Sequence, residues 1–433
     1  MRLYNARMTD IYPFRGYRYA AEVVGGLENV VTQPYDKISD DLREVYLRRS
    51  PFNIVRVIRN PDYEDAARHL NEWIHRGVLR QDEQPALYVY EQTFPFEGEQ
   101  LSRRGVIGLI ALDDPASVVH GHENVLEEPL QDRLRLIRAT EANEGLVFTL
   151  FSDPSRSFDD TLEEIVKGSP PAAEVSDDFG VLNRLWPVHD PGAVRRIQQS
   201  LGGSPLFIAD GHHRFQTSLL FHRECREKGW RPRAPESFDK RMVAVFNMES
   251  EGMRILPTHR GIVEMAQWDP NLFLPRLREK FRLRFGDVED VYQAVRRGDH
   301  VFGFAWLESG SVRAVAAELD PKWATNPDFL GSVPEPLRFL DVILLHHVVL
   351  DEVLGVKPED VAAGRFVRYY REREALLEDV RQGEVQLACL LKPTSLQEVK
   401  HVAERGFRMP QKSTDFYPKL LTGLVLMKMQ IER

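Results

Sequence analysis

The stretch PLFIADGHHRFQTSLLFHRECREK, residues 205–228, decides the fold of this chain. Its apolar start, residues 205–209, predicts a short buried strand, and residues 212–228 carry apolar side chains at the spacing of an amphipathic helix. Asp210 and Gly211 form the turn between these two elements. Further along the chain, MVAVFNM at residues 242–248 predicts a second buried strand. Together these segments predict a β-loop-α-β unit.

The segments around this unit also alternate between strand and helix. Apolar residues at 86–92 and 105–112 predict two neighbouring strands, and residues 129–142 predict an amphipathic helix. Residues 153–180 are rich in proline and acidic side chains, and we interpret them as a surface excursion with one short helix near Leu162. The predicted fold class is α/β with α+β character: a mixed sheet with a β-loop-α-β anion-binding unit, plus a smaller inserted α+β subdomain.

The length of 433 residues is enough for two or three domains. We predict a main α/β domain at residues 1–265 that holds the candidate active site. Residues 266–330 are predicted to form the small α+β subdomain, and residues 331–433 a C-terminal α/β segment that packs back on the main domain. Within that last segment, the apolar residues 337–354 predict a helix.

Composition excludes several classes of protein. The chain has 66 acidic and 57 basic residues, a net charge of -9, so it lacks the generally basic surface that coats nucleic acid. Its two cysteines rule out a disulfide framework and a Cys-rich metal site, which fits a reducing cytoplasm. No apolar stretch reaches the roughly 20 residues that cross a bilayer. We therefore expect a cytoplasmic protein without nucleic-acid or membrane partners, and its oligomeric state stays open.

The run from Asp210 to Arg214 predicts an anion site. The N-terminus of a helix presents free N–H groups and about half a positive charge, and Gly211 lets a ligand approach the backbone closely. His212, His213 and Arg214 can add hydrogen-bond donors, and a guanidinium matches the geometry of phosphate oxygens. In the alternative interpretation, Asp210 only caps the helix and the histidines are solvated.

A second cluster, His120-Gly121-His122-Glu123, offers a general base. A carboxylate beside an imidazole can accept a hydroxyl proton during group transfer, which makes Glu123 and His122 catalytic candidates. The cluster lacks the i, i+4 spacing of zinc-protease motifs, so a bound zinc is the less favoured interpretation. Equally, these side chains could only hydrogen-bond within a loop.

Two further clusters carry cations and hydroxyl groups. Arg260 follows Pro257-Thr258-His259, and Lys412 precedes Ser413 and Thr414. The second run is not a phosphate-binding P-loop, because Gln411 replaces the required glycine. Lys412 can still bind phosphate as a point charge, with Ser413 and Thr414 as donors. A plain surface loop is the alternative.

Seven short motifs occur in order along the chain: Pro34-Tyr35-Asp36, Pro51-Phe52-Asn53, His122-Glu123, Arg138-Ala139-Thr140 with Asn143, and residues 209–214, 257–260 and 409–419. Their order resembles that of an uncharacterised bacterial and archaeal family, domain of unknown function 1015. The resemblance covers nearly the whole chain, although Val125 stands where the family usually has threonine and Asp415 replaces a usual aromatic residue.

The Asp-Gly-His-His-Arg segment at 210–214 is similar to the phosphate-binding motif of the ParB and sulfiredoxin superfamily, which includes free serine kinases. This second resemblance implies a ParB/sulfiredoxin-like fold for the unit and nucleotide phosphates at its helix N-terminus. It also implies a carboxylate elsewhere that acts as base toward the serine hydroxyl. It covers only the motif with its flanking strand and helix.

The leading hypothesis is a phosphotransferase that uses ATP or ADP with Mg²⁺ and acts on a small hydroxylated metabolite such as free serine. Phosphates would be held by Gly211, His212, His213 and Arg214, with Arg260, Lys412, Ser413 and Thr414 neutralising or binding the transferred group. Glu123 with His122 would be the base, and Asp210 would lie near the metal. We expect all these residues to line one cleft. The alternatives are a nucleotide-sensing protein without rapid turnover and a metal-dependent hydrolase that uses His120, His122, Glu123, Asp210 and His212.

Overall fold

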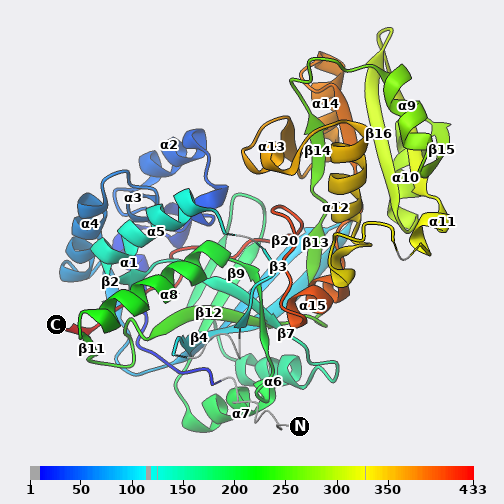
Figure 1. Cartoon of the computed structure of the whole chain (residues 1–433). Coiled ribbons are helices and arrows are strands. Elements are labelled where there is room, and N and C mark those ends of the chain that lie inside the picture. Colours follow the sequence, from blue (N-terminus) through cyan, green and yellow to red (C-terminus); the bar gives the residue numbers. More distant parts are fainter. Residues whose placement is uncertain (1–9, 114–118, 124, 327) are drawn as a thin grey trace. The chain divides into compact units, whose positions relative to one another are not determined.

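The computed structural model describes residues 10–113, 119–123, 125–326 and 328–433. These residues form two compact units (Figure 1). Unit 1 holds the described residues of 1–121, 125–254 and 418–433, and unit 2 those of 122–124 and 255–417. The chain therefore enters unit 2 twice, and its last 16 residues return to unit 1.

A mixed eight-stranded sheet forms the framework of unit 1. Its strands are β3 (Leu87–Phe96), β4 (Glu99–Ala111), β5 (Val119–His120), β7 (Val147–Phe151), β8 (Ala173–Ser176), β9 (Leu182–Val188), β10 (Leu206–Asp210) and β12 (Lys240–Asn247). They are ordered β5-β10-β7-β12-β4-β3-β9-β8. Strand β10 is parallel to β5 and antiparallel to β7, whereas β12 is parallel to β7 and antiparallel to β4. This order places β10 and β12 on either side of β7.

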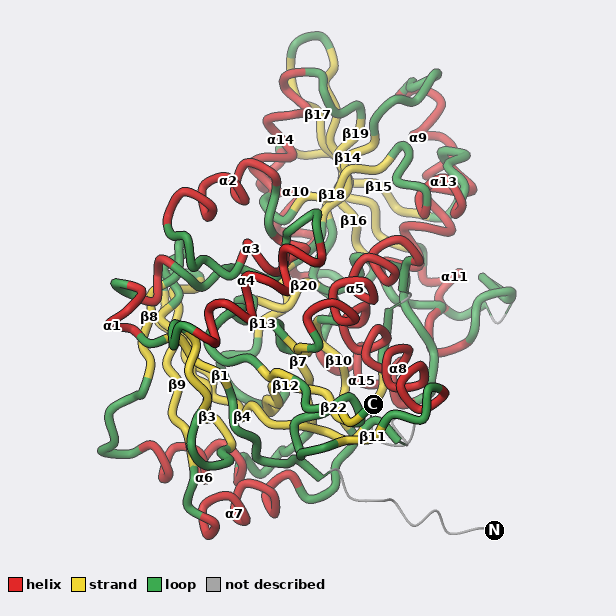
Figure 2. The backbone as a smooth tube through the Cα atoms, turned by 90° about the vertical axis from the view of Figure 1, so that its left-hand side faces the viewer, coloured by secondary structure: helices red, strands yellow, loops and turns green. Residues whose placement is uncertain are grey.

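Unit 1 also contains eight helices among its described residues. They are α1 (Ala21–Val24), α2 (Asp40–Arg49), α3 (Val55–Ile58), α4 (Tyr63–His75), α5 (Glu127–Thr140), α6 (Ser157–Val166), α7 (Pro191–Leu201) and α8 (His212–Glu227), with short 3-10 turns η1 (Leu27–Asn29) and η2 (Tyr35–Lys37). Helices α6 and α7 lie together (Figure 2) and bury Phe158, Leu162 and Ile197 in the core beneath the sheet. Helix α8 packs on α5, β7 and β12.

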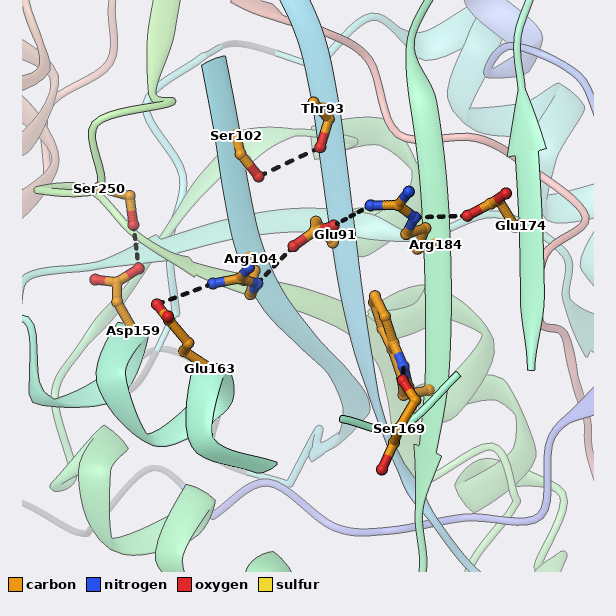
Figure 3. Close-up of polar contacts among 11 residues, drawn as sticks. Glu91, Thr93, Ser102, Arg104, Asp159, Glu163, Ser169, Glu174, Arg184 and Ser250 are labelled. Atoms are coloured by element: carbon orange, nitrogen blue, oxygen red, sulfur yellow. Dashed lines mark hydrogen bonds and ion pairs between the residues drawn. The ribbon is translucent and has the colours of Figure 1, made fainter. Parts of the chain in front are cut away.

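A ladder of ion pairs crosses the sheet of unit 1 (Figure 3). Glu91 on β3 lies directly opposite Arg104 on β4 and Arg184 on β9, with Nε of Arg104 at 2.5 Å and Nη1 of Arg184 at 3.2 Å from its carboxylate. Arg184 also binds Glu174 on β8 at 2.6 Å, and Arg104 reaches Glu163 on α6 at 3.3 Å. Cross-strand pairs of opposite charge stabilise a sheet. Here each arginine lies between two carboxylates.

Short strand pairs complete unit 1. They are β1 (Tyr17–Tyr19) with β2 (Leu79–Gln81), β6 (Ala142–Asn143) with β21 (Met427–Lys428), and β11 (Arg231–Pro232) with β22 (Ile431–Glu432). Two of these pairs involve the C-terminal residues, which explains why the end of the chain belongs to unit 1.

Unit 2 is built on a six-stranded antiparallel sheet. Its strands are β14 (His259–Ile262), β15 (Phe281–Gly286), β16 (Val301–Glu308), β17 (Ser311–Leu319), β18 (Val367–Tyr370) and β19 (Leu387–Leu390), and a separate pair joins β13 (Arg254–Leu256) to β20 (Asp415–Tyr417). The sheet order is β15-β17-β16-β19-β14-β18.

Two apolar clusters lie against the unit 2 sheet. One contains residues of α9 and of the segment 341–353, and the other residues of α10 and α14. The helices of this unit are α9 (Pro270–Arg278), α10 (Val288–Arg297), α11 (Pro321–Ala324), η4 (Glu335–Leu337), α12 (Asp341–Leu344), the π-helix η5 (Leu345–Val353), α13 (Pro358–Ala362), α14 (Arg373–Gln382) and α15 (Leu396–Glu404).

The predicted mixed α/β fold class is confirmed, as are the predicted elements of the β-loop-α-β unit, which correspond to β10, α8 and β12. The surface interpretation of residues 153–180 is wrong in part. The predicted helix near Leu162 is α6, but it buries Phe158 and Leu162 in the core, and β8 adds a strand at the sheet edge. The predicted helix at 337–354 begins only at Asp341 and continues as a π-helix.

The predicted boundaries at residues 265 and 330 do not coincide with those of the two units. Strands β15, β16 and β17 come from the predicted subdomain, and β16 pairs with β19 from the predicted C-terminal segment. This pairing joins both segments in one sheet. Among the described residues, no helix combines the length and the apolar character that crossing a membrane requires.

Candidate anion site

The turn from β10 into α8 is tight and depends on glycine. Gly211 has a φ of 97°, a left-handed conformation that side chains with a Cβ avoid. A Cβ at this position would also lie 3.2 Å from Cζ of Arg214. As Gly211 has no side chain to cap the helix, the first N–H groups of this 16-residue helix receive no side-chain bond from the N-cap position.

Asp210 lies at the end of β10 between two cations. Its Oδ1 accepts a hydrogen bond from Nζ of Lys419 at 3.1 Å, and its Oδ2 accepts one from Nη2 of Arg214. Burial alone would raise the pKa of Asp210, but the charges of Lys419, Arg214 and Lys37 hold it well below its usual value. Asp210 is therefore ionised, and it fixes two positive side chains beside the N-terminus of α8.

The predicted donors of the anion site make contacts within unit 1. Nη1 of Arg214 donates to the carbonyl of Leu146, and Nε2 of His213 accepts a bond from the backbone N–H of Leu126 at 3.0 Å. His212 is buried, 7% exposed, close to Gly121. These contacts orient the side chains of the first turn, and Nε of Arg214 has no hydrogen-bond partner in the described part of the chain.

The candidate base lies in unit 2 with two of its predicted neighbours. Nε2 of His122 lies 3.0 Å from Oγ1 of Thr414, and the Thr414 hydroxyl donates to Oε1 of Glu123 at 3.3 Å. The backbone N–H of Met409 donates to the carbonyl of His122 at 2.7 Å, which attaches this short segment to the loop before β20. The structure thus brings together His122, Glu123 and Thr414, which are separated by about 290 residues in the chain.

Arg260 and the loop at 412–413 also belong to unit 2. Nη2 of Arg260 donates to the carbonyl of Lys412 at 3.1 Å, and its guanidinium lies 5.5 Å from the ring centre of Tyr369. Burial lowers the pKa of Arg260 to about 10. Lys412 itself is exposed in a left-handed conformation, and the Ser413 hydroxyl is bonded to the carbonyl of Pro410 at 2.6 Å.

The predicted site residues thus fall into two groups. Unit 1 holds residues 210–214, and unit 2 holds His122, Glu123, Arg260 and residues 412–414. Convergence of both groups on one cleft stays a prediction.

A small cavity in unit 1 involves residues that the sequence did not single out as a site. Its volume is about 40 Å³. Its polar lining includes the side chains of Tyr35, Arg133, Glu144, Arg214, Thr217 and Arg241.

The lining contains three arginines and one carboxylate. Arg133 is paired with Asp132 and Arg214 with Asp210, whereas Arg241 donates only to neutral oxygens of described residues. Burial, aided by the nearby Arg214, lowers the pKa of Arg241 to about 9. Burial raises the pKa of Glu144, although a hydrogen bond from Thr140 opposes this effect. The signal in the sequence is weak: Arg241 directly precedes the apolar run of residues 242–248 at the start of β12.

Metal binding at Asp210 finds no support in this geometry. Both of its carboxylate oxygens accept bonds from cationic side chains, whose charge would repel Mg²⁺. Within the described residues, no three His, Cys, Asp or Glu side chains are grouped so that they could hold a metal ion.

Comparison with known proteins gives one family. The model of a family described as "Protein of unknown function (DUF1015)" matches residues 11–343. No curated protein matches the chain.

Three solved structures are distantly similar. A conserved hypothetical protein from Pyrococcus furiosus is 14% identical, with a TM-score of 0.35, and the match covers 72% of this chain and 90% of the other. A free serine kinase in complex with AMP is 15% identical, with a TM-score of 0.37 and coverage of 72% and 86%. SbnI with a C-terminal truncation, from Staphylococcus aureus, is 12% identical, with a TM-score of 0.35 and coverage of 73% and 85%. At such distances the ligands of these proteins say nothing about this chain.

Proposed function

Since this chain belongs to the family of proteins of unknown function DUF1015, we propose an activity from its own residues: nucleotide-dependent phosphoryl transfer to a small hydroxylated metabolite. ATP or ADP is the donor, and a free hydroxy amino acid such as serine is the acceptor. The transferred phosphoryl group forms a bond to the acceptor oxygen as its bond to the nucleotide breaks, and the nucleotide leaves as ADP or AMP. The hydroxyl proton passes to a base.

The turn between β10 and α8 is the observation that carries this proposal. It combines the positive end of a long helix, a glycine that admits a ligand to the backbone, and the cations Arg214, Lys419 and Lys37 around Asp210. Asp36 also acts on Arg214, so three cations face two carboxylates and leave one net positive charge for a phosphate. In this proposal Gly211, His212, His213 and Arg214 bind the phosphates.

The roles of the unit 2 residues are part of the same proposal. Glu123 accepts the hydroxyl proton, because its carboxylate is held by the Thr414 hydroxyl beside His122. Arg260, Lys412, Ser413 and Thr414 are the candidates for binding or neutralising the transferred group. The mechanism assigns no step to a metal, since Asp210 is already paired with two cations.

The first test is product formation. The full chain is incubated with ATP or ADP and a panel of serine, threonine, homoserine and small sugars, and ³¹P NMR detects a new phosphate ester. Glu123→Gln should keep nucleotide affinity and lower turnover by about 10²- to 10⁴-fold, because it removes the proton acceptor and keeps the shape. Nucleotide binding without any product would favour a sensor over a phosphotransferase.

The second test is nucleotide affinity. Arg214→Ala should weaken binding by about 1.5–3 kcal/mol, the range for a hydrogen bond to a charged group. Arg223→Ala, an exposed arginine on the same helix, is the matched control and should leave affinity unchanged. Equal affinities of the Arg214 variant and the control would contradict the phosphate assignment.

A further inference from the structure

The cavity of unit 1 lies between α5, α8, η2, the start of β12 and the segment after β6. Arg241 is 4% exposed and Thr217 is 2% exposed, so both side chains have been removed from water. Neither belongs to the turn at the N-terminus of α8, because Thr217 lies in the second turn of that helix and Arg241 on β12. The cavity therefore extends beyond the candidate phosphate site.

Three buried donors that line this cavity lack a partner in the structure. Nε of Arg241, Nε of Arg214 and the hydroxyl of Thr217 make no hydrogen bond to any described residue. The remaining nitrogens of Arg241 are used, since Nη2 donates to the carbonyl of Gly145 and Nη1 to the hydroxyl of Ser218 at 3.4 Å. Buried donors are nearly always bonded in folded proteins, so this arrangement calls for an acceptor.

The charges indicate that the acceptor is an anion. Arg241 donates to neutral oxygens, and Arg214 shares the carboxylate of Asp210 with Lys419. Glu144 is the carboxylate of the lining; burial raises its pKa, whereas Thr140, Arg133 and Arg241 oppose this shift. A buried charge without a paired group is costly, and a bound anion would remove that cost for Arg241.

The volume of the cavity limits the anion that it could hold to a small one. About 40 Å³ is roughly three times the ~10–15 Å³ that one water molecule needs. A carboxylate is planar, singly charged and smaller than a phosphate, and its two oxygens match guanidinium donors. We propose that this cavity binds the carboxylate of a small organic acid, whose oxygens accept bonds from Arg241 and Thr217.

This binding does not require phosphoryl transfer and is measured without nucleotide. Arg214 borders both the cavity and the turn at Gly211. The further step, that the bound acid is the phosphoryl acceptor, rests on the proposed function. Failure of the kinase assay would leave the carboxylate site intact, and the two proposals are tested separately.

Isothermal titration calorimetry tests the site. Sodium acetate, lactate, glycerate and inorganic phosphate are titrated into the full chain at constant ionic strength. At least one carboxylate should bind, and Arg241→Met and Thr217→Val should each weaken it about ten- to a hundredfold, as expected for a bond to a charged group. Arg223→Met on the exposed side of α8 is the control and should bind normally.

Thr217→Val keeps the measurement independent of folding. It preserves side-chain shape and removes a hydroxyl without a partner, so its melting temperature without ligand should not fall. Binding of phosphate but of no carboxylate would overturn the proposal. So would the absence of any anion binding, which would mean a cavity filled only by water, or carboxylate affinity that both variants retain.

Discussion

Arginines in two regions of unit 1 differ in how their charge is paired. In the ladder across the sheet, Arg104 and Arg184 each lie between two carboxylates, and Glu91 joins them at the centre. In the cavity, Arg241 donates to a carbonyl and a hydroxyl, and its Nε has no partner in the described structure. Both arginines of the ladder are thus paired with carboxylates, whereas the cavity lining contains hydrogen-bond donors that have no partner among the described residues.

The difference follows from where each set lies. In the ladder, Glu91, Arg104, Arg184 and Glu174 oppose one another in the register of neighbouring strands, and only Glu163 comes from a helix. Cavity residues come from helices, a strand and loops, and their charges are not matched by register. An unpaired buried nitrogen, rather than the number of arginines in a cluster, therefore distinguishes the proposed ligand site from a structural ion-pair ladder.

The largest effect on stability is expected at Asp210, which pairs with Lys419 and with Arg214 of the cavity lining. Asp210→Ala leaves Arg214 and Lys419 buried without their shared carboxylate. Breaking a buried ion pair from one side costs about 3–5 kcal/mol, so the free energy of unfolding should fall by that amount. Urea unfolding of the full chain measures it. A loss below about 1 kcal/mol would mean that the two cations find other partners and that Asp210 is not their anchor.

A smaller effect is expected at the centre of the ladder. Glu91→Gln keeps the shape of a side chain that is 6% exposed but removes the charge that Arg104 and Arg184 share. The expected loss is about 2 kcal/mol in the same unfolding measurement. Glu163→Gln, at the exposed end of the ladder, should change stability by no more than about 0.5 kcal/mol. Equal losses in both variants would show that position in the ladder has no influence.

Sequence predicted those parts of the molecule that are encoded by neighbouring residues. The strand, turn and helix from β10 to α8 follow one another directly, and Gly211 lies in the turn that was predicted there. Capping of α2 by Ser39 is another local feature, because the Ser39 side chain accepts a bond from the N–H of Leu42, only three residues away.

The cavity could not be predicted because its residues meet only through the fold. Tyr35 precedes the sheet, Arg133 and Thr217 lie on different helices, and Arg241 joins them because β12 lies two strands from β10. Lys419 reaches Asp210 across 209 residues through the returning C-terminal segment. The periodicity of apolar residues reflects only nearby positions, so it does not predict such long-range contacts.

Replacing one arginine in each region should change the free energy of unfolding with a different sign in the cavity and in the ladder. Arg241→Met deletes a buried charge that has no paired carboxylate, so the free energy of unfolding should stay unchanged or rise by up to about 1 kcal/mol. Arg104→Met in the ladder should lower it by about 1 kcal/mol, because Glu91 keeps only Arg184. A clear loss of stability for Arg241→Met would identify Arg241 as a structural residue.

The smallest effect concerns Glu144 and depends on pH. Burial raises the pKa of Glu144 above its usual 4.5, partly offset by Thr140, Arg133 and Arg241. A raised pKa means that the fold prefers the protonated carboxyl. Its contribution to stability is present below pH 4.5 and is lost as pH rises through the pKa of the folded state. Glu144→Gln is neutral at every pH, so its stability relative to the natural chain should increase from pH 4 to pH 7.

Glu163→Gln serves as the control in this pH series, because it also removes one negative charge but at an exposed position. The two variants are unfolded with urea at each pH, and the slope of stability against pH is compared with that of the natural chain. A rise for Glu144→Gln that the control does not share would show that the cavity disfavours its own carboxylate. Parallel slopes would mean that Arg133 and Arg241 keep Glu144 ionised in the fold. Glu144 would then pair with the arginines of the cavity, as Glu91 does with those of the ladder.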